Sequence, residues 1–150
     1  MKKRPLTIYI LILLWLTLSI MFILWGIFSL SVVLEVPKWS TLNTLQPQLY
    51  FAYLIATIIW FVFSSIFIIF AYGTFRGDSW TWSTGLIFST IFLAVFGLML
   101  ASFIVTAIIF LDWFSVSGLI TVVLSLLADL GIVYFLTRPI DKDYFEVTRE

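Results

Sequence analysis

The sequence contains no cysteine and no histidine. Without cysteine the chain can form no disulfide and offers no thiolate, and without histidine it has neither an imidazole base nor the usual zinc and haem ligand. These two absences exclude most enzyme mechanisms. We therefore expect a protein that is not an enzyme and that holds no metal and no cofactor.

Charge is also scarce. Only 11% of the 150 residues are charged, and eight Lys or Arg balance eight Asp or Glu, so the chain has no basic surface that would bind nucleic acid. Hydrophobic residues make up 63% of the chain, whereas a globular protein has roughly half. With a mean hydropathy of +1.17, the chain is expected to have the lipid bilayer as its partner and solvent.

Four long apolar runs predict an all-α membrane protein, a four-transmembrane-helix bundle formed by one domain over residues 1–150. A β-barrel would show short alternating segments instead of continuous runs. The first run also follows basic residues, as a secretory signal does, but it is far longer than the roughly 7–15 residue core of a signal peptide. The predicted spans are 6–34, 49–75, 84–111 and 119–136, followed by a tail at 137–150.

The basic residues predict the orientation. With four spans, both termini and the loop around Arg76 share one side, which holds seven of the eight Lys and Arg residues, while Lys38 lies on the other. The positive-inside rule then places the N and C termini in the cytoplasm of a cell whose plasma membrane the chain crosses. Interface anchors are expected at Trp39 and Trp113 outside, and at Trp80, Trp82, Arg138 and Tyr144 inside.

Asp129 is the one charge within a predicted span. An ionisable group in hydrocarbon costs about 2.5–3.5 kcal/mol on insertion scales and usually faces the bundle interior or a wet cavity. Thr121, Ser125 and Asp129 are spaced four residues apart, so they form one polar stripe on the helix. The acid could fix helix packing, pair with a basic residue of a partner subunit, or carry protons or cations. Its candidate hydroxyl partners within the chain are Ser64, Ser65, Ser102 and Thr106.

Small residues in the third span suggest a helix-packing face. Ala94, Gly97 and Ala101 are spaced three and four residues apart, and small residues four apart let helix backbones approach closely in a membrane. The face could pack within the bundle or form a homodimer.

The tail begins at Pro139, which is expected to end the fourth helix at or just before Arg138. After it, Ile140, Tyr144 and Val147 share one face and predict a short amphipathic turn on the membrane surface. The nearby carboxylates of Asp141, Asp143 and Glu146 lack the spacing of a calcium loop, so no cation site is predicted.

Two segments of the chain resemble a recurrent pattern in small, uncharacterised four-helix membrane proteins of prokaryotes. In that pattern a helix ends in Tyr-Gly, a short loop leads to Trp-x-Trp, and the last helix ends in an Arg-Pro turn followed by Tyr-Phe. The matching segments here are Tyr72-Gly73 with Trp80-Thr81-Trp82, and Arg138-Pro139 with Tyr144-Phe145. The resemblance implies the four-helix topology and no particular activity.

Two functions fit these observations. The first is a non-catalytic integral membrane subunit or scaffold that packs against a larger membrane protein complex or against itself, because the loops are short and Asp129 could be a docking point. The alternative is a small oligomeric transporter or channel that uses Asp129 for proton or cation passage. An intramembrane enzyme is disfavoured, because paired acid and base catalysis needs a second group.

Overall fold

The computed structural model describes residues 5–35, 46–109, 113–139 and 144–145, which form four α-helices. Each helix contains a stretch long and apolar enough to cross a membrane, which confirms the predicted all-helical architecture with four helices of spanning length. The helices are α1 (Leu6–Glu35), α2 (Gln46–Arg76), α3 (Ser79–Ile109) and α4 (Trp113–Thr137).

A tight turn joins α2 to α3. Gly77 has a φ of +79°, the left-handed conformation that favours glycine after a helix. The N–H of Asp78 donates to the Gly73 carbonyl at 3.1 Å and the N–H of Gly77 donates to the Thr74 carbonyl at 3.2 Å, which is a Schellman motif. Because the turn is so short, α3 begins at Ser79, five residues before the predicted start of the third span at 84.

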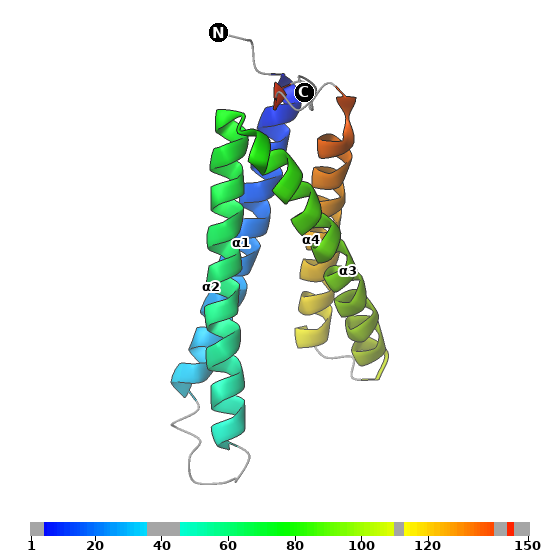
Figure 1. The fold of residues 1–150 in the computed structure, drawn as a ribbon. Helices are drawn as coiled ribbons and strands as arrows, with labels where there is room; N and C mark the ends of the chain where they lie inside the picture. Colours follow the sequence, from blue (N-terminus) through cyan, green and yellow to red (C-terminus); the bar gives the residue numbers. More distant parts are fainter. Residues whose placement is uncertain (1–4, 36–45, 110–112, 140–143, 146–150) are drawn as a thin grey trace.

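The helices form two antiparallel hairpins (Figure 1). α1 packs along α2 and α3 packs along α4, while α1 and α4 join the hairpins and α2 meets α3 over only a short length. The hairpins lie closest at the end that holds Gly77 and Asp78, which we call the turn end, and they diverge toward the opposite end (Figure 1). The start of α1 and the end of α4 also lie at the turn end.

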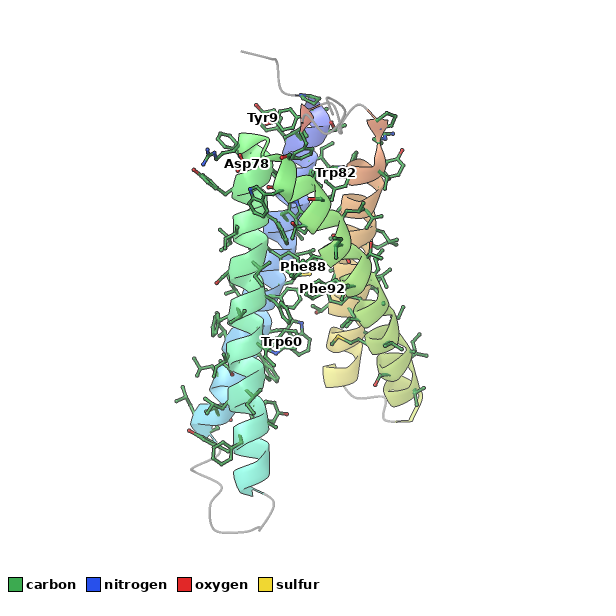
Figure 2. The ribbon with its side chains drawn as sticks, viewed as in Figure 1. Tyr9, Trp60, Asp78, Trp82, Phe88 and Phe92 are labelled. Carbon is green, nitrogen blue, oxygen red and sulfur yellow. The ribbon has the colours of Figure 1, made fainter. Side chains whose placement is uncertain are left out.

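Aromatic side chains fill the core between the hairpins (Figure 2). Phe22 of α1 lies with its ring centroid 5.3 Å from that of Phe67 of α2 and 5.8 Å from that of Phe92 of α3. Trp15 is fully buried, and its ring centroid is 4.9 Å from that of Phe70. Such ring pairs add about 0.5–1.5 kcal/mol each beyond burial, so the aromatic cluster is a main contact between α1, α2 and α3.

The tail differs from the predicted surface-lying turn. Phe145 is fully buried and belongs to the hydrophobic core cluster. The Tyr144 hydroxyl donates a hydrogen bond to the Phe75 carbonyl at 3.1 Å. Tyr144 thus packs against the turn between α2 and α3, where a Cβ on Gly77 would lie 3.2 Å from its ring, and Phe145 is buried in the core. Ile140 and Val147 are outside the described residues.

Candidate functional site

The polar stripe of α4 faces the interior of the bundle. Thr121 and Ser125 line a pocket between the helices, and Asp129, one turn nearer to the turn end, is fully buried. The sequence therefore identified a face of α4 that points toward the other helices. The stripe divides into two parts, a pocket at Thr121 and Ser125 and a closed site at Asp129.

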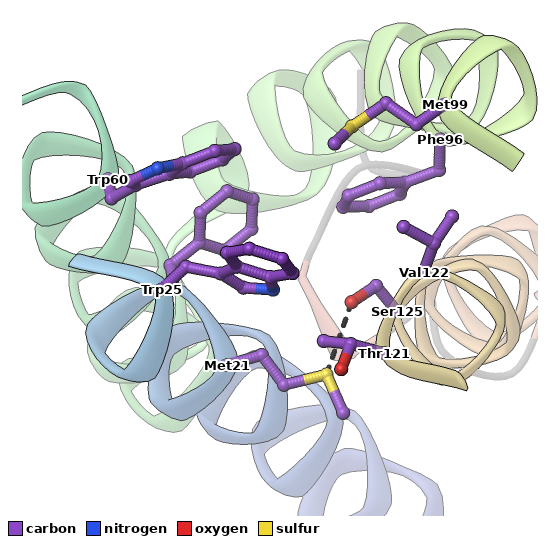
Figure 3. Close-up of a pocket in the computed structure, with 9 residues that line it drawn as sticks. Met21, Trp25, Trp60, Phe96, Met99, Thr121, Val122 and Ser125 are labelled. Atoms are coloured by element: carbon purple, nitrogen blue, oxygen red, sulfur yellow. Dashed lines mark hydrogen bonds between the residues drawn. The ribbon is translucent and has the colours of Figure 1, made fainter. Parts of the chain in front are cut away.

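The pocket lies between all four helices, in the half of the bundle where the hairpins diverge (Figure 3). The centre of a water molecule has about 20 Å³ of free space there, and roughly 10–15 Å³ is needed to hold one water. The pocket is thus a one-water space and not a conduit. Its lining is Met21, Phe22, Trp25, Trp60, Phe96, Met99, Thr121, Val122 and Ser125.

One hydrogen bond crosses the pocket between α1 and α4. The Ser125 hydroxyl donates to the Met21 sulfur at 3.1 Å (Figure 3). A thioether is a weak acceptor, so this bond holds the serine less firmly than a bond to a carbonyl would. Ser125 lies between the pocket and Asp129 along α4.

Asp129 has no exposed surface, and within the described part of the chain neither of its carboxyl oxygens has a hydrogen-bond partner. The basic residue nearest in sequence on the same helix, Arg138, is engaged elsewhere, because its guanidinium donates to the Tyr134 hydroxyl and lies 4.5 Å from the centre of that ring. A buried carboxyl group without partners is costly in a protein interior. The arrangement therefore calls for a partner.

Ser89 of α3 is the hydroxyl that faces the Asp129 carboxyl group. Of the four hydroxyl residues suggested by the sequence, the three whose side chains are described are not placed there. Ser64 instead bonds to Ser19 at 2.9 Å, and Ser65 donates to the Phe61 carbonyl of its own helix at 2.9 Å. Ser102 is exposed on α3, and the side chain of Thr106 is outside the description.

The register of α3 against α4 explains why Ser89 holds this position. Trp82, near the start of α3, contacts Leu136, near the end of α4, and the two helices then run antiparallel. Ser89 lies seven residues after Trp82 on α3, and Asp129 lies seven residues before Leu136 on α4. The buried residues of α3 recur at intervals of three or four, a pattern that the structure reveals and that the uniformly apolar sequence does not. They are Thr81, Ser89, Phe92 and Phe96, with Gly85 at the same spacing.

Another buried polar group without a partner lies on α1. The indole N–H of Trp15 is buried and has no hydrogen-bond partner among the described residues, and the same holds for the Ser89 hydroxyl. The Trp15 ring packs on α3, because its Cζ2 atom lies 3.2 Å from where a Cβ on Gly85 would be. Gly85 and Ser89 are one turn apart on the same face of α3.

Of the six predicted interface anchors, four are described as side chains, and they gather at the turn end. Trp80 is 44% exposed, as an anchor in the headgroup region would be. Trp82 and Tyr144 also bond within the chain, since the Trp82 indole donates to the Leu136 carbonyl and Tyr144 to the Phe75 carbonyl. Arg138 bonds to Tyr134. Trp39 lies outside the described residues, and Trp113 is the first residue of α4 but its side chain is not described.

The small residues Ala94, Gly97 and Ala101 lie on an exposed face of α3. A Cβ added at Gly97 would meet no atom within 4 Å. These residues therefore do not pack closely against another described helix of this chain. Their possible packing against a second copy stays a prediction.

Comparison of the chain with protein families, with curated proteins and with solved structures finds no match. Function must therefore be argued from the site alone. Across the described residues, no three His, Cys, Asp or Glu side chains gather closely enough to hold a metal ion. What the site offers is one buried acid, two buried hydrogen-bonding neighbours, and a small pocket one turn away.

Proposed function

We propose that this chain is a non-catalytic integral membrane subunit or scaffold that packs against a larger membrane protein. The observation that carries the proposal is the incomplete contact between the hairpins: α2 meets α3 only briefly, and the hairpins diverge away from the turn end (Figure 1). Helices in a membrane associate by close packing and not by escape from water, so a bundle left open on one side favours completion by another helix.

The side chains around the pocket at this end of the bundle support the same proposal. Trp25 and Trp60 face Phe96 and Met99 across the pocket, and all four are large, adaptable apolar side chains (Figure 3). Such side chains are enriched where proteins pack on partners. We propose that a transmembrane helix of the larger protein packs against the bundle at this end, since the pocket itself has room for only a water molecule.

The orientation is part of the proposal. Arg76 ends α2 and Arg138 follows α4, so both lie at the turn end, and Lys2, Lys3 and Arg4 precede α1 in the sequence. The positive-inside rule then puts the turn end in the cytoplasm and the open end of the bundle on the outer side of the plasma membrane. The resemblance to small four-helix prokaryotic proteins implies the same topology and stays a prediction.

A crosslinking experiment tests the proposed opening. The photo-crosslinker benzoylphenylalanine replaces Trp60 or Met99 in the pocket, and at matched depth it replaces Ile58 or Leu98, which are 57% and 75% exposed on the same two helices. We expect one membrane protein to be crosslinked from both pocket positions and more weakly from the two controls. The same protein should co-purify in equimolar amount in mild detergent.

Two outcomes would contradict the subunit proposal. In one, the chain purifies alone from native membranes and the pocket positions crosslink only to lipid. In the other, all four positions crosslink equally to many proteins, as a chain without a specific partner would.

A second function is favoured by the polar stripe of α4. Thr121 and Ser125 lead from the pocket toward the buried Asp129, which is the arrangement that a proton or cation pathway would use. If the chain conducts protons, Asp129→Asn should abolish flux into liposomes, whereas Asp78→Asn at the turn should leave it unchanged. This function would be excluded if liposomes with the unaltered protein were as impermeable to protons and cations as liposomes with Asp129→Asn.

A further inference from the structure

Three buried polar side chains, one on each of three helices, lie in the interior of the bundle. The Trp15 indole N–H, the Ser89 hydroxyl and the Asp129 carboxyl group are all fully buried, and among the described residues none of them makes a hydrogen bond. They come from α1, α3 and α4. An unsatisfied buried donor or acceptor costs about 1–3 kcal/mol, so three such groups on helices that pack against one another call for a partner.

The contacts between helices bring the three groups together. Trp15 packs against Gly85 of α3, with its Cζ2 atom 3.2 Å from a Cβ placed there, and Ser89 lies one turn further along the same face. Ser89 in turn faces Asp129 of α4. On the third side, the residue before Trp15 packs on α4, because Leu14 Cδ1 lies 3.0 Å from a Cβ placed at Gly131, two residues from Asp129.

The hydrogen-bonding capacities of the three groups are complementary to one small molecule. The indole donates only, a hydroxyl both donates and accepts, and a carboxyl group accepts. A water molecule has two donors and two acceptors, and buried waters typically bridge about three otherwise unsatisfied polar groups. A metal cation would repel the indole N–H, which leaves only two protein ligands.

We propose that Trp15, Ser89 and Asp129 form a binding site for one water molecule that joins α1, α3 and α4 inside the bilayer. The water accepts from the Trp15 indole, donates to the Asp129 carboxyl group and bonds to the Ser89 hydroxyl. This site goes beyond the proposed subunit function and does not depend on a partner protein.

Nuclear magnetic resonance of the full chain in lipid nanodiscs tests the site through its indole. The seven tryptophans are labelled with ¹⁵N, and Trp15→Phe assigns the Trp15 signal. We expect a cross-peak between the Trp15 indole proton and water, although Trp15 has no exposed surface. The cross-peak should be lost in Ser89→Ala and in Asp129→Leu, each of which removes one anchor of the water.

Thr90→Ala is the matched control, because Thr90 is the next residue on α3 and its exposed hydroxyl donates to the Leu86 carbonyl of its own helix at 2.8 Å. This variant should keep the Trp15 cross-peak. Circular dichroism verifies that each variant is as helical as the parent. The parent protein decides the question by itself if a variant fails to fold, since absence of the cross-peak in the parent overturns the proposal.

Two further outcomes would also overturn it. A cross-peak that persists in Asp129→Leu and disappears only in Ser89→Ala arises from proton exchange at the serine hydroxyl, not from a bridging water. A Trp15 signal that shifts when Na⁺ or K⁺ replaces N-methylglucamine at constant ionic strength, and stops shifting in Asp129→Leu, shows that the site holds a cation.

Discussion

The indole N–H of Trp82 donates a hydrogen bond of 2.7 Å to the carbonyl of Leu136. Leu136 lies in the last turn of α4, where carbonyl groups have no partner within the helix. The start of α3 thus caps the end of α4 and locks the second hairpin at the turn end. The pairing also sets the register that places Ser89 opposite Asp129.

Trp82→Phe removes this capping bond while keeping a large ring. We expect the free energy of unfolding to fall by about 1 kcal/mol, the usual net value of such a bond. Titration with denaturing detergent, followed by circular dichroism, measures it. Trp80→Phe, at an exposed position two residues away, should have a smaller effect, and equal effects would contradict the capping role.

Phe145→Ala removes the fully buried side chain of the tail. Truncating a buried Phe typically costs about 3–5 kcal/mol, and we expect the loss to open the turn end, where the tail packs beside α2 and α3. The melting temperature and the rate of proteolysis of the tail report both effects. Phe51→Ala, at a position that is 59% exposed, should leave both unchanged.

The Ser19 hydroxyl pairs with the Ser64 hydroxyl at 2.9 Å and with the Ser64 carbonyl at 3.2 Å, which joins α1 to α2. In a double-mutant cycle with alanine we expect a coupling energy of about 0.6 kcal/mol, the average for such bonds between membrane helices. Ser65→Ala is the control, because its hydroxyl bonds within its own helix. Strictly additive effects of the Ser19 and Ser64 substitutions would show that the bond is not formed.

Replacing two different glycines with alanine should change the free energy of unfolding in opposite directions. A Cβ on Gly26 would lie 3.1 Å from the Phe61 ring, so Gly26→Ala is expected to lower stability by about 1 kcal/mol as the ring is displaced. Gly97 has open space, so Gly97→Ala should raise stability by about 0.5–1 kcal/mol through helix propensity. Both are measured by detergent titration. A loss of stability in Gly97→Ala that depends on protein concentration would instead indicate a dimer at this face.

Much of the fold was predictable because lipid imposes a simple rule. A segment in hydrocarbon must satisfy its backbone hydrogen bonds internally, so the four apolar runs had to be helices of spanning length. The inward face of α4 was predictable as well, since a polar stripe avoids lipid. The tail was not, because the pattern of Ile140, Tyr144 and Val147 predicts a surface-lying turn and carries no sign that Phe145 is buried in the core.

The side chains that face the polar stripe of α4 could not be predicted from the sequence, for a related reason. Each apolar helix is hydrophobic on all sides, so periodicity does not show which face meets which neighbour. Nothing in the sequence distinguishes Ser89 from Ser64, Ser65 and Ser102. Only the packing register of the helices places Ser89 opposite Asp129.

By itself, then, the sequence determined the number of helices, their approximate positions and the one helix that carries a buried acid, because each of these follows from local hydropathy. Tertiary structure alone decided that Trp82 caps α4, that Phe145 closes the turn end, and that Trp15 and Ser89 join Asp129. Those relations depend on how helices of nearly uniform hydrophobicity rotate and slide against one another. Side-chain packing sets that arrangement, and no single segment of the sequence determines it.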